Sequence, residues 1–121
     1  MKLRLLLAFL LCFPVAARAE LHTWDCQFDR RVDEGGVAEE QMRLIFVVDD
    51  TSNRISMTGN AGTIAVELHV GENVLSFVER VPSGAVHSTT ISSDGSAVHS
   101  RNTVILGRFV AAQHFGQCII F

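Results

Sequence analysis

Short runs in which apolar and polar residues alternate dominate the chain from residue 20 onward. Alternation with a period of two is typical of β-strands that bury one face and expose the other. Valine, isoleucine and threonine, which favour strands, are frequent in these runs. The pattern predicts eight strands, near residues 22–28, 42–48, 54–58, 63–70, 73–81, 85–92, 96–105 and 108–116.

One segment between the predicted strands lacks this alternation. Residues Asp29–Gln41 are mostly polar and include the pair Gly35-Gly36. Glycine pairs and polar clusters between periodic runs are typical of loops. We therefore expect a long loop here, or a short helix over Val37–Gln41.

The turns between the runs predict which residues face each other, because the length of a hairpin loop sets the strand register. We expect tight turns at Gly59–Gly62, Gly71-Glu72, Pro82–Gly84, Asp94-Gly95 and Leu106-Gly107. With these turns the large apolar residues fall on one continuous face. The predicted fold is all-β: a small antiparallel up-and-down β-barrel or curled meander of about eight strands, with a two-sheet sandwich as the alternative.

Residues 1–19 have the pattern of a secretory signal peptide. Lys2 and Arg4 precede an apolar run over Leu5–Phe13, and Ala17-Arg18-Ala19 provides a small-residue cleavage site. Cleavage would leave residues 20–121 as a single β domain. We expect the protein to be exported, to a bacterial periplasm or to the medium, with no integral membrane segment after cleavage.

The exported part would keep two cysteines, Cys26 and Cys118, near its two ends. Cysteine pairs in exported proteins usually form disulfides. Closing a loop of 92 residues stabilises the fold by about 4–5 kcal/mol in the chain-entropy model. The sequence predicts a Cys26–Cys118 disulfide, and two free, buried thiols are the alternative.

The charge balance excludes some partners. Residues 20–121 keep all 13 acidic residues but only seven of the 10 basic ones, which gives a net charge of −6. Because binding to phosphate backbones requires basic patches, we expect no nucleic-acid partner. Anionic membrane surfaces are disfavoured for the same reason.

Signals for catalysis are missing from the sequence. It contains no G-x-S-x-G or H-E-x-x-H motif and no phosphate-binding glycine loop. A disulfide would leave no thiol nucleophile after export. We therefore expect a protein that is not an enzyme and that carries no cofactor and no metal.

The predicted register places a cluster of polar residues on the inner face, toward one end of the sheet. The five residues are Glu79, His87, Ser100, Asn102 and Gln113. Facing side chains on neighbouring strands lie about 4.5–5.5 Å apart at Cβ, so these groups would meet. A barrel with a polar mouth and an apolar opposite end would bind a small molecule or a partner's side chain. The alternative is a purely structural cluster.

Two further histidines, His99 and His114, face each other in the predicted register on the outer face. Two imidazoles at this separation can share a metal ion, but a protein zinc site normally needs three or four ligands. His69 lies two strands away from His99, and no suitably spaced cysteine or acid completes a set. We expect two solvent-facing histidines without a metal.

The small, exported, eight-stranded architecture with cysteines near both ends resembles the periplasmic inhibitors of C-type lysozyme. Those inhibitors carry an S-G-x-x-Y loop that blocks the lysozyme cleft. The corresponding stretch here is Ser83-Gly84-Ala85-Val86-His87, with histidine in place of tyrosine, and the chain contains no tyrosine. The resemblance implies an inhibitor that acts through an exposed loop. A structural envelope component without a ligand is a third hypothesis.

Overall fold

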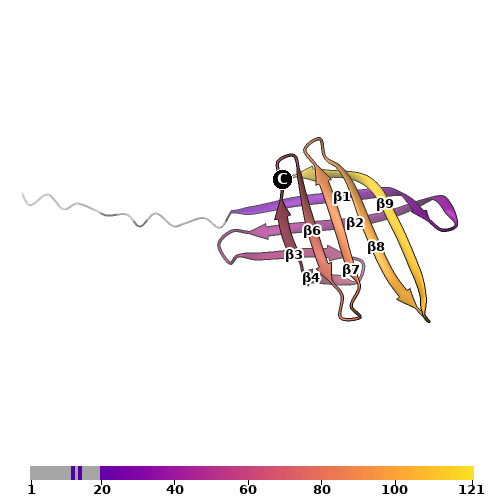
Figure 1. Ribbon diagram of the computed structural model, residues 1–121. Coiled ribbons are helices and arrows are strands. Elements are labelled where there is room, and N and C mark those ends of the chain that lie inside the picture. Colours follow the sequence, from indigo (N-terminus) through magenta and orange to yellow (C-terminus); the bar gives the residue numbers. More distant parts are fainter. Residues whose placement is uncertain (1–11, 13, 15–19) are drawn as a thin grey trace, which may run out of the picture.

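The computed structural model describes Cys12, Pro14 and residues 20–121, so the predicted signal peptide lies largely outside the described residues. Nine strands occupy most of residues 20–121 (Figure 1). They are β1 (Leu21–Asp33), β2 (Gly36–Asp49), β3 (Arg54–Gly59), β4 (Gly62–Ala65), β5 (Glu67–Val70), β6 (Val74–Arg80), β7 (Val86–Ser92), β8 (Ser96–Ile105) and β9 (Arg108–Ile120).

All nine strands form one antiparallel sheet in the order β4-β3-β2-β1-β9-β8-β7-β6-β5. The two edge strands, β4 and β5, follow each other directly in the chain, with Val66 between them. The Val66 backbone N–H donates to the Ile55 carbonyl across 3.0 Å. The sheet therefore curls until its edges nearly meet, which confirms the predicted all-β meander and barrel.

The prediction of a loop or helix over Asp29–Gln41 is wrong. This segment completes β1 and begins β2, which form a long hairpin that turns at Glu34-Gly35. Its end extends beyond β3 but remains paired with β9 up to Asp33. Its inner face lines the polar cavity instead of the apolar core, so the apolar alternation disappears. Polar pairs replace apolar contacts there: Arg31 Nη1 donates to Glu40 Oε2 across 2.9 Å.

A β-bulge between Phe28 and Arg30 interrupts the register of β1 with both of its neighbours. A bulge inserts one extra residue and so shifts the phase of the side-chain alternation. Cys26 and Phe28 face the core before it, whereas Arg31 and Asp33 line the interior cavity after it. The bulge therefore brings charged side chains into one end of the barrel.

Most of the predicted turns give the observed pairs. Met57 faces Ile64, Leu75 faces Ile91 and Val104 faces Phe109, as expected. At Gly71 the register differs by two residues, so that Leu68 faces Phe77 instead of Leu75. A shift of two residues keeps every side chain on its predicted face.

The predicted two-residue length of the turn at Asp94-Gly95 is wrong, and this error has the largest consequence for the site. The loop has three residues, 93–95, and Ile91 faces Ala97 instead of Val98. A two-residue type I′ turn needs positive φ at both central positions, but here Gly95 alone adopts it, at +90°. The Asp94 carboxylate instead accepts the Ser96 N–H across 2.8 Å. A slip of one residue turns every side chain of β8, and of β9 paired to it, to the opposite face.

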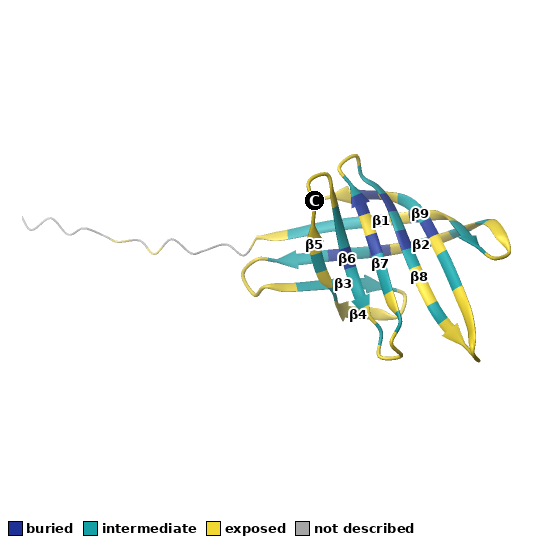
Figure 2. Ribbon diagram, viewed as in Figure 1, coloured by how far each residue is buried: buried dark blue, intermediate teal, exposed yellow. Residues whose placement is uncertain are grey.

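The core fills one end of the barrel (Figure 2). Phe46 and Phe77 stack there with their ring centroids 4.2 Å apart, and Trp24 meets Phe77 edge-on at 5.5 Å. The predicted disulfide is confirmed: Cys26 on β1 and Cys118 on β9 face each other and are bonded. The buried apolar residues are Cys26, Phe28, Leu44, Phe46, Phe77, Ile91, Ala97 and Cys118.

Candidate ligand site at the barrel mouth

The end of the barrel opposite the core contains a cavity of about 650 Å³. This volume lies within the range of about 300–1,000 Å³ that is usual for small-molecule sites. Its apolar lining comes from β2, β3 and β4 and includes Met42, Leu44, Met57 and Ile64. Its polar lining includes Arg31, Glu40, Glu79, His87, Arg101 and His114. The molecule thus has the predicted apolar end and polar mouth.

The structure brings together only part of the predicted polar cluster. Glu79 and His87 face each other on β6 and β7 inside the mouth, and His87 Nδ1 lies 3.2 Å from Glu79 Oε2. Ser100, Asn102 and Gln113 lie on the outer face, where Gln113 Nε2 donates to Ser100 Oγ across 3.4 Å. The one-residue slip in the β7–β8 turn separates the two groups.

The same slip places His99 and His114 inside the barrel. They face each other on β8 and β9 as predicted, but the expectation that both face solvent is wrong. Their exposed fractions are 1% and 4%. The rings of His87, His99 and His114 form a row, with centroids 6.2 Å apart at each step.

Two hydrogen bonds determine the protonation of His99. Arg101 Nε donates to His99 Nε2 across 3.1 Å, and because arginine is always a donor, Nε2 must be the unprotonated nitrogen. The other nitrogen, Nδ1, then carries the proton and donates it to Thr89 Oγ1 across 2.7 Å. Burial, with the nearby charges of Arg101, His114 and His87, lowers the pKa of His99 to about 3. His99 is therefore neutral at pH 7.

Arg101 differs from the other two arginines that line the cavity, Arg31 and Arg43. Arg43 forms an ion pair with Asp25 at 2.6 Å. Arg31 forms ion pairs with Asp33 and Glu40, at 3.0 and 2.9 Å. Within residues 20–121 Arg101 forms no ion pair; its Nε is held by His99 and its Nη2 lies 3.7 Å from Met42 Sδ. Arg101 thus presents a positive charge to the cavity without a carboxylate partner.

On the opposite side of the mouth, Glu40 joins two elements. Its Oε2 accepts from His114 Nε2 across 3.2 Å and from Arg31 Nη1 across 2.9 Å. The hydrogen bond from His114, together with the positive charge of Arg31, lowers the pKa of Glu40. The second nitrogens of the two cavity-lining histidines, His87 Nε2 and His114 Nδ1, are buried and have no partner among the described residues.

Five residues of this site were missed by the sequence reasoning: Arg31, Glu40, His99, Arg101 and His114. The first two lie in the segment that was expected to be a loop. The other three would have been placed inside if Asp94-Gly95 had been read as part of a three-residue turn, in which glycine takes the left-handed position.

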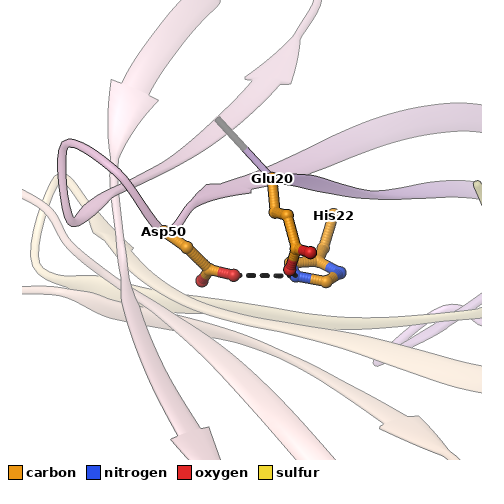
Figure 3. A group of neighbouring side chains, drawn as sticks. All are labelled: Glu20, His22 and Asp50. Carbon is orange, nitrogen blue, oxygen red and sulfur yellow. Dashed lines mark hydrogen bonds and ion pairs between the residues drawn. The ribbon is translucent and has the colours of Figure 1, made fainter. Parts of the chain in front are cut away.

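A second group of polar side chains lies near the other end of β1 (Figure 3). His22 Nε2 lies 2.9 Å from Asp50 Oδ2 and 3.9 Å from Glu20 Oε2. In the described part of the chain these are the only three potential metal-ligand side chains found with their ligand atoms all within 4.8 Å of one another. They are solvent-exposed, and the arrangement is that of a surface ion pair.

Comparisons with protein-family models, with curated proteins and with solved structures find no match to this chain. In the part of the chain that the structure describes, no helix has the length and apolar character needed to cross a membrane. The function must therefore be argued from the geometry of the mouth.

Proposed function

We propose that this protein is a small exported binding protein, without enzymatic activity, that holds an amphipathic molecule with a carboxylate or similar anionic head group in the mouth of its barrel. The observation that carries this proposal is the guanidinium of Arg101, which has no carboxylate partner among the described residues, in a cavity that also has an apolar wall on β2, β3 and β4. A carboxylate can accept two parallel N–H bonds from one guanidinium, which fixes its position as well as its charge.

The neighbours of Arg101 prepare it for this role. His99 accepts the Nε–H, which leaves the two terminal nitrogens for a ligand. Because His99 is neutral at pH 7, it holds the guanidinium without neutralising its charge, and the positive charge of Arg101 remains available to the ligand. The buried Thr89–His99 hydrogen bond holds the imidazole in place, so the guanidinium is oriented before the ligand arrives.

The apolar wall of the cavity would contact the apolar part of the ligand. Met42, Met57, Leu44 and Ile64 line the side of the cavity formed by β2, β3 and β4. Methionine side chains are flexible and polarizable and adapt to apolar chains of different shape. A hydrocarbon tail on this wall would leave water, while the head group pairs with Arg101.

The unpartnered histidine nitrogens support a second polar contact. Leaving a buried donor or acceptor unsatisfied costs about 1–3 kcal/mol. His87 Nε2 and His114 Nδ1 are buried, so a hydroxyl group near the ligand head satisfies either nitrogen once its ring turns toward the cavity. We therefore expect hydroxylated acids to bind more tightly than plain acids of equal length.

The test is a calorimetric titration with dodecanoate and, in parallel, with dodecanol, which has the same tail without the charge. We expect dodecanoate to bind and Arg101→Gln to weaken it at least tenfold, because hydrogen bonds to charged groups contribute about 1.5–3 kcal/mol. Arg80→Gln is the matched control, since Arg80 pairs with Glu67 on the exterior. Equal affinity for the acid and the alcohol, or an unchanged affinity in Arg101→Gln, would refute the proposal.

The alternative is an inhibitor that acts through the exposed loop at Ser83-Gly84. These two residues are exposed in the β6–β7 turn. His87, which stands where the lysozyme inhibitors have tyrosine, points into the barrel and contacts Glu79. Because the residue at that position is not offered to a partner, we favour ligand binding. Slowing of lysozyme at micromolar protein would reverse this preference.

A further inference from the structure

The hairpin of β8 and β9 extends past the strands on either side of it. The pairing of β8 with β7 ends at Ser100, and the pairing of β9 with β1 ends at Ala112. Residues 101–111 therefore form a two-stranded projection (Figure 1). An isolated two-stranded hairpin is at best marginally stable in water, so this projection adds little to the stability of the barrel.

The outer part of the projection is largely exposed (Figure 2), and between Val104 and Val110 it has exposed apolar side chains on both faces and at the tip. Val104 and Phe109 face each other on the outer face, and Phe109 is 74% exposed. Ile105 and Val110 lie on the inner face and are about half exposed. Leu106, at the tip, is 98% exposed. Contiguous exposed apolar side chains mark interaction sites on soluble proteins.

Leu106 also occupies a conformation that disfavours it. Its φ is +51°, and that of Gly107 is +75°, as in a type I′ turn. Positive φ suits glycine, asparagine and aspartate at these positions, whereas a side chain such as leucine is strained. Leu106 makes no packing contact within residues 20–121 that would offset the strain of its positive φ. Strained residues that contribute nothing to the fold are expected at functional positions.

The shape of the patch indicates what covers it. A second copy of the chain or a flat protein surface would cover one face of the hairpin, but a lipid surface surrounds a projecting tip on all sides. The backbone groups on the free edges cannot enter hydrocarbon unpaired, so the tip alone would enter. Arg108 is the only charged residue among 103–111, and its long side chain can reach the phosphate level from the tip.

We propose that the Val104–Val110 tip of this hairpin docks the protein on a lipid bilayer, with Leu106 and Phe109 entering the interface. The bilayer is one of uncharged or zwitterionic lipids. Glu34, in the neighbouring β1–β2 turn, shares a groove with Phe109, and residues 20–121 carry a net charge of −6. Anionic lipids therefore weaken docking at low salt.

Docking of the hairpin would also bring the ligand cavity close to the lipid surface. Thr103, Ile105 and Val110 on the inner face of the hairpin form part of its wall, so the docked mouth lies beside the lipid surface. An amphipathic acid can then pass between the bilayer and the barrel. This route rests on the proposed function, whereas docking itself rests only on the hairpin.

The test is flotation of the purified protein with phosphatidylcholine vesicles, with no ligand added. We expect the protein to float with the vesicles, and Leu106→Asn to reduce partitioning about tenfold or more, the effect of withdrawing one leucine from an apolar phase. Because asparagine tolerates positive φ, Leu106→Asn should keep or raise the unfolding midpoint. Phe109→Ser is a second variant with the same expected loss of flotation. Val70→Asn, which changes an exposed valine on β5, is the control and should float normally.

Three outcomes would overturn docking: no flotation of the unchanged protein, equal flotation of Leu106→Asn, or a dimer that Leu106→Asn abolishes while no protein floats. The last result would assign the hairpin to a second copy of the chain. If the protein floats but does not bind dodecanoate, the proposed function alone is refuted. If it binds dodecanoate but does not float, docking alone is refuted.

Discussion

Acid should destabilise this protein through His99. Its ring is buried and neutral, and its pKa in the folded protein is about 3 against a usual value of 6.5. Above pH 6.5 the imidazole is neutral in both states and the stability is fully present. Between pH 6.5 and about 3 the unfolded chain binds a proton that the folded protein excludes, so stability falls as the pH falls.

The expected size follows from the pKa difference. One pH unit within this window costs about 1.4 kcal/mol, so lowering the pH from 7.5 to 4.5 removes about 3 kcal/mol through this group alone. The cause is burial first, then the charge of Arg101, and then the neighbouring His114 and His87. A loss of this size is a large fraction of the 5–15 kcal/mol by which small domains are typically stable.

The assay is urea unfolding followed by the fluorescence of Trp24, the only tryptophan, which contacts Phe77 in the core. Unfolding free energies are measured at pH 7.5, 6.5, 5.5 and 4.5. His99→Gln keeps a polar group but removes the titration, so its loss between pH 7.5 and 4.5 should be smaller by about 3 kcal/mol. His69→Gln, at an exposed position on β5, is the control and should behave like the unchanged protein.

The reasoning would be refuted if His99→Gln lost as much stability on acidification as the unchanged protein. It would equally be refuted if His69→Gln, rather than His99→Gln, flattened the pH dependence.

Three further changes test the packing. Gly116→Ala should reduce stability by several kcal/mol or prevent folding, because its Cβ would lie 2.0 Å from a backbone oxygen of β1; thermal unfolding measures this. Reducing the Cys26–Cys118 disulfide should lower the unfolding free energy by up to about 4–5 kcal/mol, measured in urea with and without reductant. Thr89→Val should cost about 1–3 kcal/mol, because it leaves the buried His99 Nδ1–H without an acceptor, measured at pH 7.5.

The glycine and threonine substitutions each have a matched control. Gly59→Ala would bring a Cβ to 3.0 Å from a movable side-chain carbon of Leu44, so it should cost less than Gly116→Ala. Thr90→Val, at an exposed position beside Thr89, should cost less than Thr89→Val. A tolerated Gly116→Ala, or equal effects of the two threonine variants, would contradict the described packing.

Much of the fold follows from local features of the sequence. Alternation identified the strands wherever one face is buried, and most of the turns gave the right register because their loop lengths are set by local residues. Cys26 and Cys118 were correctly paired because the export signal predicts an oxidising compartment and no other cysteine would remain after cleavage.

The polar site was harder to predict because it depends on which alternate side chains of each strand face the interior. Asp94-Gly95 is compatible with a two-residue or a three-residue turn, and the two alternatives place His99 on opposite faces. The end of the β1–β2 hairpin lines the cavity with polar residues instead of packing on the apolar core, so Arg31 and Glu40 show no apolar alternation that would identify a strand. The bulge before Arg31 is likewise set by packing against two neighbouring strands, which no local pattern records.

The central claim is that an amphipathic acid occupies the barrel mouth and pairs with Arg101. A native mass spectrum of the protein, isolated gently from the cells that make it and from their medium, tests this claim most directly. We predict the mass of residues 20–121 with the disulfide formed, plus one small acid that is released on denaturation and is missing from Arg101→Gln. A protein that carries no added mass, or an adduct that Arg101→Gln retains in full, would contradict the account.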